Sequence, residues 1–197
     1  AILLAFIAAA CTTVVPDTGR KQVNFLNPSE EAALGLSEFQ KLKSEKRISN
    51  NATYNAQLQR VGSRLSKVMP VPNAQWEFVV FEDSSPNAFA LPGGKVGVHT
   101  GLFQISQNEA GLAAVVGHEV AHVVARHSGE RMSQGIVSAG AVAGAAAIIN
   151  NRGGNPAAAS VLLGGGALIL NRKFSREQEL EADKLGLHSF RSFFLVL

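Results

Sequence analysis

One apolar stretch of the chain, residues 109–125, is interrupted by three ionisable side chains. His118, Glu119 and His122 lie in a run that otherwise consists mostly of Ala, Val, Leu and Gly. A run of this length and composition predicts a buried helix. Ionisable groups inside such a helix carry a desolvation cost of several kcal/mol unless they are paired or bind a metal ion. The fold must therefore supply partners for these three side chains within its core.

The two histidines are spaced to share one metal ion. Residues four apart in a helix lie within roughly 40° of each other on one face, so the imidazoles of His118 and His122 are stacked one turn apart. Glu119 lies on the flank of the same face, where a carboxylate can take a proton from an attacking water molecule. This is the H-E-x-x-H pattern of zinc metallopeptidases. The alternative is a chance grouping in a core helix, which the strongly apolar surroundings disfavour.

A second helix offers the remaining protein ligand. Ser175 and Gln178 have the spacing of a capping box, and the helix that they open carries Glu179, Glu181 and Asp183. A peptidase zinc site needs a third protein ligand and one open position. Glu179 and Asp183 share a face, whereas Glu181 lies about 200° from Glu179. We therefore predict Glu179 as the ligand and Asp183 as the acceptor for the second ring nitrogen of a ligand histidine. An acidic, solvated face is the alternative.

The other segments predict an α+β domain that is mainly helical, with a small antiparallel sheet. Ser29 and Ser106 are expected to cap the first helix and the metal-binding helix, respectively. Periodicity and turn residues place two helices and three strands before the metal-binding helix. These are helices Pro28–Arg47 and Thr53–Val68, and strands Trp76–Phe81, Asn87–Leu91 and Lys95–Thr100, the last two joined by Pro92-Gly93-Gly94.

Composition excludes several classes of protein. The 197 residues suit one domain with a sizeable core. The net charge of +3 is small, and no basic stripe interleaved with aromatic residues indicates nucleic-acid binding. A single cysteine excludes an internal disulfide and a zinc site built from several cysteines.

The N-terminal residues predict that the protein is exported to the cell envelope. Ile2–Ala10 is a short apolar run that fits part of a signal peptide, residues 1–10. Cys11 follows small residues, as in a bacterial lipobox, and would be lipidated. Residues 11–27 would then form the lipidated cysteine and a polar tether, leaving residues 28–197 as the metallopeptidase domain. A buried N-terminal strand with a free cysteine is the alternative.

Two further segments leave alternatives open. The stretch Gly135–Leu170 is rich in Gly and Ala and is divided by a polar loop into two apolar pieces, each too short to span a bilayer. We predict two tightly packed helices, with a membrane-touching hairpin as the other possibility. The segment Ser189–Leu197 is either a final packed strand or helix, or an atypical end of a C-terminally truncated chain.

Three blocks of sequence carry a resemblance to a known family. They are Asn87–Gly94 with Thr100-Gly101-Leu102, Asn108–His127, and Ser175-Arg176 with Glu179–Asp183. In this order they resemble metallopeptidase family forty-eight, which contains the CAAX prenyl protease, HtpX and Oma-like zinc endopeptidases. The small bacterial periplasmic lipoproteins of this family are the most similar. The resemblance implies a zincin-like domain with one zinc ion at His118, His122 and Glu179, and Glu119 as general base.

The resemblance also implies a substrate and a place of action. The strand containing Asn87, Ala88, Phe89 and Ala90 would edge the active-site cleft and pair with an extended substrate backbone. Substrates would be misfolded or misassembled cell-envelope proteins, cleaved by an enzyme anchored through a lipid to the outer membrane in the periplasm. His127 is a weak candidate for stabilising the oxyanion and is otherwise expected at the surface or a helix end. His99 and His188 are expected to be structural.

Two other functions fit the sequence less well. One is a non-catalytic, chaperone-like assembly lipoprotein with a structural zinc ion, which would have no need of Glu119. The other is a membrane-embedded protease that uses the Gly/Ala-rich segment as its anchor. The sequence therefore predicts a zinc metalloendopeptidase of the envelope.

Overall fold

The computed structural model describes residues 12–136 and 174–195. The predicted signal run, Cys11 and nearly all of the Gly/Ala-rich stretch lie outside the described residues. The expected fold class is confirmed, since the described chain is α+β and mainly helical. None of the helices within the described ranges is both long and apolar enough to cross a membrane.

The central sheet has three strands, β3 (Glu77–Phe81), β4 (Ala88–Leu91) and β5 (Lys95–His99). Their order is β3-β5-β4, which leaves β4 at the edge. The expected antiparallel sheet is wrong in one pair: β4 and β5 are antiparallel, but β3 and β5 are parallel. The chain reverses direction between β3 and β4 and again at the turn before β5. Because of these two reversals, β5 runs parallel to β3, and it lies between β3 and β4 in the sheet.

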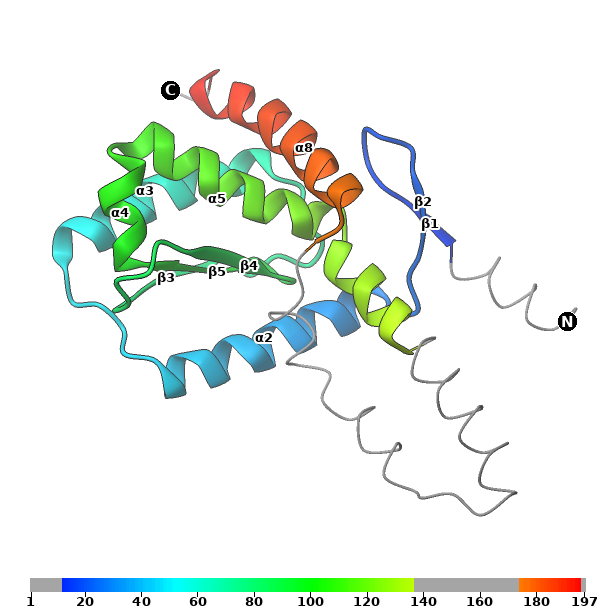
Figure 1. Ribbon diagram of the computed structural model, residues 1–197, viewed down its shortest axis with the longest axis horizontal. Helices are drawn as coiled ribbons and strands as arrows, with labels where there is room; N and C mark the ends of the chain where they lie inside the picture. Colours follow the sequence, from blue (N-terminus) through cyan, green and yellow to red (C-terminus); the bar gives the residue numbers. More distant parts are fainter. Residues whose placement is uncertain (1–11, 137–173, 196–197) are drawn as a thin grey trace, which may run out of the picture.

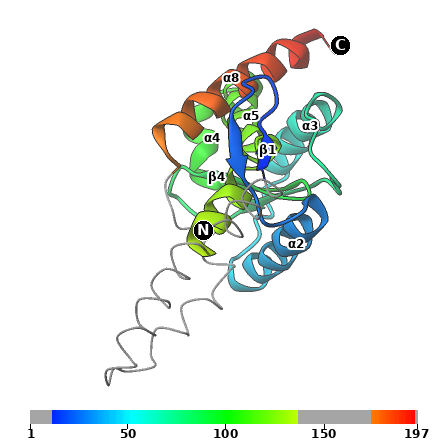
Figure 2. The ribbon, with the colours of Figure 1, turned by 90° about the vertical axis from the view of Figure 1, so that its right-hand side faces the viewer.

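Helices cover both faces of this sheet (Figures 1 and 2). On one face lie α3 (Ala52–Val68), α4 (Thr100–Ser106) and α5 (Glu109–Val124), and on the other lies α2 (Pro28–Glu45). The helix α8 (Arg176–Leu195) runs beside α5. The larger core is mostly aliphatic, and its fully buried side chains include Leu58, Val61, Leu65, Val96, Val98, Leu112 and Val116. A smaller core of Phe39, Leu42, Phe81, Leu91 and Met132 joins α2 to the sheet.

Two predicted helix caps are wrong. The side chain of Asn27, not Ser29, accepts hydrogen bonds at the start of α2. Asn108, not Ser106, caps α5 by accepting from the backbone N–H of Gly111 at 2.9 Å. Asparagine caps as well as serine does, and in both places it stands immediately before the first helical residue. Ser106 instead ends α4.

The expected tether is also wrong, because the described part of it packs on the domain. The antiparallel strands β1 (Thr12–Val14) and β2 (Lys21–Val23) form a hairpin. The side chain of Val15 is buried, and Gln22 Nε2 donates to the carbonyl oxygen of Ala125 at 2.8 Å. Strands of three residues carry little signal of their own, and this hairpin is held by contacts with the end of α5 and with α8.

Candidate metal centre

The position of α8 against α5 assembles the site. The predicted capping box is confirmed: Gln178 N–H donates to Ser175 Oγ, and Ser175 N–H donates to Gln178 Oε1. Farther along α8, Gly186 faces α5, where an added methyl group would lie 3.4 Å from His118 Cα. This close approach of the two helices brings Glu179 against the histidine face of α5.

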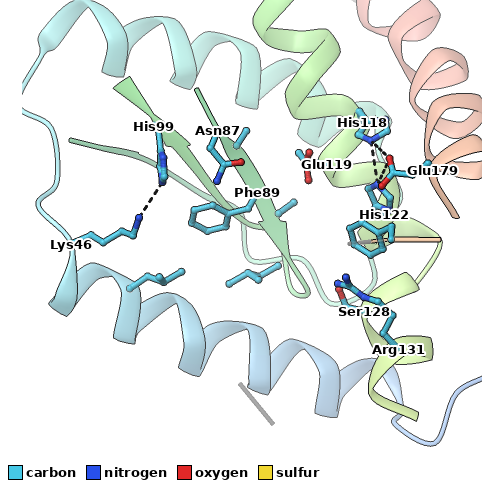
Figure 3. Close-up of a pocket in the computed structure, with 15 residues that line it drawn as sticks. Lys46, Asn87, Phe89, His99, His118, Glu119, His122, Ser128, Arg131 and Glu179 are labelled. Carbon is cyan, nitrogen blue, oxygen red and sulfur yellow. Dashed lines mark hydrogen bonds and ion pairs between the residues drawn. The ribbon is translucent and has the colours of Figure 1, made fainter. Parts of the chain in front are cut away.

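The structure brings the three predicted ligand residues together (Figure 3). His118 Nε2 lies 3.2 Å from His122 Nε2 and 3.2 Å from Glu179 Oε2. The remaining distance, from His122 Nε2 to Glu179 Oε2, is 3.7 Å. Atoms that bind a tetrahedral zinc ion at 2.0–2.1 Å are separated by about 3.3 Å. The two nitrogens and one oxygen therefore have the spacing and the chemistry of a three-residue zinc site.

The outer nitrogen of His118 has a carboxylate partner. His118 Nδ1 lies 2.9 Å from Asp183 Oδ1, as the sequence predicted. Asp183 is one turn after Glu179, so the helix that offers the ligand oxygen also offers this acceptor. A carboxylate at Nδ1 keeps the proton on that nitrogen. The lone pair of His118 Nε2 is therefore directed at His122 and Glu179.

The outer nitrogen of His122 has a buried partner that sequence reasoning missed. His127 is completely buried, contrary to the expected surface position, although it does stand at a helix end, as the first residue of the helix over residues 127–136. Its Nδ1 lies 2.9 Å from His122 Nδ1, and its Nε2 lies 3.1 Å from Glu181 Oε2. Glu181 can only accept a hydrogen bond when ionised, so His127 donates from Nε2 and accepts at Nδ1. His122 then donates from Nδ1, and its Nε2 lone pair is free for a metal ion.

Burial determines the charge states within the site. It lowers the pKa of His122 to about 2, with further lowering by His127, His118 and Arg131, so the imidazole is neutral. Burial also raises the pKa of Glu119 to about 7, against the influence of His118 and with a contribution from Glu179. A neutral imidazole is the form that binds metal ions. A carboxylate with a pKa near neutrality is suited to accept and release a proton.

The site opens into a cavity of about 450 Å³ between α2 and α5 (Figure 3). Glu119 lines it beside the three predicted ligand residues, and the edge strand β4 forms one wall. The predicted substrate-binding residues Asn87, Ala88, Phe89 and Ala90 all line this cavity.

Aromatic and basic side chains lie at the two ends of the cavity. Near the metal-ligand residues, the Phe174 ring stacks on His122 with centroids 3.6 Å apart, and the guanidinium of Arg131 lies 3.7 Å from the Phe174 ring. At the opposite end, the buried His99 Nε2 lies 3.3 Å from Lys46 Nζ. His188, on the exposed side of α8, does not line this cavity.

Comparison with known proteins agrees with this geometry. Residues 52–192 match the family model described as Peptidase family M48. The chain belongs to peptidase family M48. It is 35% identical to the mitochondrial metalloendopeptidase OMA1 of Schizosaccharomyces pombe over 176 residues, which are 88% of this chain and 50% of that protein.

Bacterial relatives of this M48 chain are also similar. The putative beta-barrel assembly-enhancing protease of Vibrio cholerae is 29% identical over 94% of this chain and 41% of its own length. The beta-barrel assembly-enhancing protease of Escherichia coli is 30% identical over 60% of this chain and 24% of its own length. The chain thus spans half or less of the length of these relatives. The matches support a protease role for this M48 domain.

Proposed function

We propose that this M48 domain is a zinc-dependent endopeptidase. The observation that carries the proposal is the convergence of His118 Nε2, His122 Nε2 and Glu179 Oε2 at zinc-ligand spacing, with Glu119 in the same cavity. Both histidines have an acceptor on the outer ring nitrogen, so both inner lone pairs are directed at one point. A zinc ion bound there would polarise the scissile carbonyl and acidify the attacking water.

Glu119 is proposed as the general base. Its carboxylate would take the proton of the attacking water and pass it to the leaving amine. The residue is displaced by one position from His118, so it faces the cavity and does not join the ligand set (Figure 3). A purely structural zinc site has no use for such a group, which favours catalysis over the non-catalytic assembly role.

Substrate is proposed to bind as an extended peptide along β4. This strand is one of the two edge strands of the described three-stranded sheet, and it lines the cavity beside Glu119 and the predicted ligand residues. An exposed edge can pair with a peptide backbone through main-chain hydrogen bonds and select side chains at alternate positions. Such binding requires an unfolded segment, which fits misfolded or misassembled envelope proteins as substrates. The names of the bacterial relatives, beta-barrel assembly-enhancing proteases, point the same way.

The proposed location is the bacterial periplasm, with a lipid on Cys11 as the membrane anchor. Support comes from the apolar run before this cysteine and from the bacterial relatives. Fractionation of a Cys11→Ser variant tests this. Release from the membrane supports the lipid anchor, whereas retention favours an anchor in the Gly/Ala-rich segment.

The activity is tested with Glu119→Gln, which keeps the size of the side chain and removes the base. We expect zinc content equal to that of the wild type and cleavage of unfolded casein lowered by about 10²- to 10⁴-fold. Glu109→Gln is the matched control, since Glu109 lies on the same helix and pairs with Arg60 at the surface. Full activity in zinc-loaded Glu119→Gln rules out the base. A zinc-loaded wild type that cleaves no unfolded protein supports the assembly role instead.

A further inference from the structure

We propose that Arg20, in the β1–β2 hairpin, is a positioning residue of the metal centre that acts through Glu181 and His127 on His122. The inference rests on the proposed zinc site, but it concerns a segment outside residues 52–192, the range that matches the family model. In the ribbon, the hairpin lies beside the first turn of α8 (Figure 1). Arg20 is the residue of the hairpin that pairs with two buried carboxylates.

Arg20 joins two carboxylates that come from different helices. Its Nε donates to Glu181 Oε2 of α8 at 2.8 Å. Its two terminal nitrogens donate to the two oxygens of Glu130 at 2.7 and 2.8 Å, a bidentate pair. Residues 127–136 are helical and follow α5 directly. Arg20 therefore holds α8 and this following helix at a fixed separation, with a rigid planar group that lysine cannot replace.

From Glu181 the contacts continue without a break to the ligand. Glu181 Oε2 accepts both from Arg20 and from His127 Nε2, and Thr18 Oγ donates to Oε1 at 2.6 Å. The hairpin thus fixes both oxygens of the carboxylate that orients His127. His127 in turn accepts from His122 Nδ1–H, as derived above. Each link sets the direction of the next, and the last link sets the ring plane of a proposed ligand.

Water has little access to the acceptors in this chain of contacts, although the side chain of Arg20 itself is 17% exposed. The side chains of Glu181 and Glu130 are 7% and 8% exposed, and His127 is 0% exposed. Without Arg20, two buried carboxylates would lose their shared cation, and Glu181 would lose one of the contacts that hold it against His127.

A second buried ion pair supplies the matched control. Arg126 donates to both oxygens of Glu31 at 2.9 and 3.1 Å and so joins α2 to the turn that follows α5. This pair is as buried as the Arg20 cluster. The hydrogen bonds of Glu31 go to Arg126 and not to His127 or to a proposed ligand. Glu31→Gln therefore weakens a comparable ion pair, beside the turn at Arg126 that precedes His127, and it removes none of the hydrogen bonds on the path from Arg20 to His122.

The test is a double-mutant cycle on zinc affinity, with the full chain. Zinc dissociation constants are measured by competition with a chromophoric chelator for the wild type, Arg20→Met, His127→Phe and the double variant. We expect Arg20→Met to weaken zinc binding by up to about 10-fold, the lower end of the effect of residues that hydrogen-bond a metal ligand directly, because Arg20 acts through Glu181 and His127. In the His127→Phe background the same substitution should have no further effect, because the path to His122 is already broken.

Other readouts separate positioning from a general loss of stability. Visible absorption of the cobalt-substituted protein should shift in Arg20→Met and stay unchanged in Glu31→Gln. If Arg20→Met does not fold, Arg20→Lys takes its place in the cycle, since lysine keeps the positive charge but lacks the planar guanidinium that pairs with both carboxylates. Equal effects of the Arg20 variant in both backgrounds, or equal effects of the Arg20 and Glu31 variants, overturn the inference. A wild type that binds no zinc overturns the proposed function itself.

Discussion

The packing of α2 on the β4–β5 turn depends on Gly35, and replacing it tests the packing directly. A methyl group added at Gly35 would overlap the carbonyl oxygen of Pro92 and lie 3.0 Å from the carbonyl carbon. Nonbonded carbon atoms prefer about 3.5–4.0 Å, and the obstacle is backbone, which cannot rotate away. Gly117 on α5 is a matched control, because its added methyl would meet only Leu65 Cδ2 at 3.7 Å, an ordinary contact.

The two substitutions should change stability in opposite directions. Overpacking costs about 1–3 kcal/mol, and at Gly35 the rigid obstacle places it in the upper half of that range. Because alanine is a better helix former than glycine, the substitution also adds about 1 kcal/mol to the free energy of unfolding. The free energy of unfolding should therefore fall by about 1–2 kcal/mol for Gly35→Ala and rise by up to about 1 kcal/mol for Gly117→Ala. Urea unfolding with a chelator present measures both without a contribution from bound metal. Gly35→Ala as stable as the wild type would refute the reasoning.

Two further predictions concern charge and exposure. The side chain of Asp183 is 67% exposed, so water can replace it as a hydrogen-bond acceptor, whereas nothing replaces the buried His127. Zinc affinity should therefore fall about 10-fold in Asp183→Ala and about 100-fold in His127→Phe. The opposite order in a chelator competition would contradict this. Burial raises the pKa of Glu130, but hydrogen bonds from Arg20 and Gln178 outweigh it and lower that pKa. The stability that Glu130 contributes is thus complete above its unfolded pKa of about 4.3 and is lost as the pH falls through the lower folded pKa. Between pH 6 and pH 3, the metal-free wild type should lose more unfolding free energy than Glu130→Gln; equal losses would contradict the assignment.

The parts of the site that could be predicted are those set by helix geometry. His118 and His122 share a face because they are four residues apart, and Glu179 and Asp183 share a face of α8 for the same reason. The capping box before α8 was also visible, since its hydrogen bonds are local. The contact between α5 and α8 is not local in the sequence. The prediction that Glu179 meets the two histidines therefore relied on the chemistry of zinc ligands and on the family resemblance.

His127 shows why the rest could not be predicted. Extending the α5 helix by five residues from His122 would place position 127 about 140° away, on a different face. The helix in fact ends at Val124, and Arg126 adopts a positive φ of 58°. This turn brings His127 back against His122. A left-handed arginine has no sequence signal, so the burial of His127 could not be predicted, and the residue was expected at the surface or at a helix end.

The hairpin is a second case of the same kind. Its strands are three residues long, and the polar residues between Thr12 and Asn27 match those of a linker. Their partners, Glu130 and Glu181, lie more than 100 residues away in the chain. A charged side chain such as Arg20 is most often exposed, and only the fold shows that its partners are buried.

Zinc content is the measurement that tests the central claim most directly. Elemental analysis of the full chain, purified in parallel as wild type and as His118→Ala, compares one intact and one incomplete ligand set. The geometry of His118, His122 and Glu179 predicts one zinc ion per wild-type chain and none in the variant. A stoichiometric zinc ion retained by His118→Ala would show that these three residues are not the metal site.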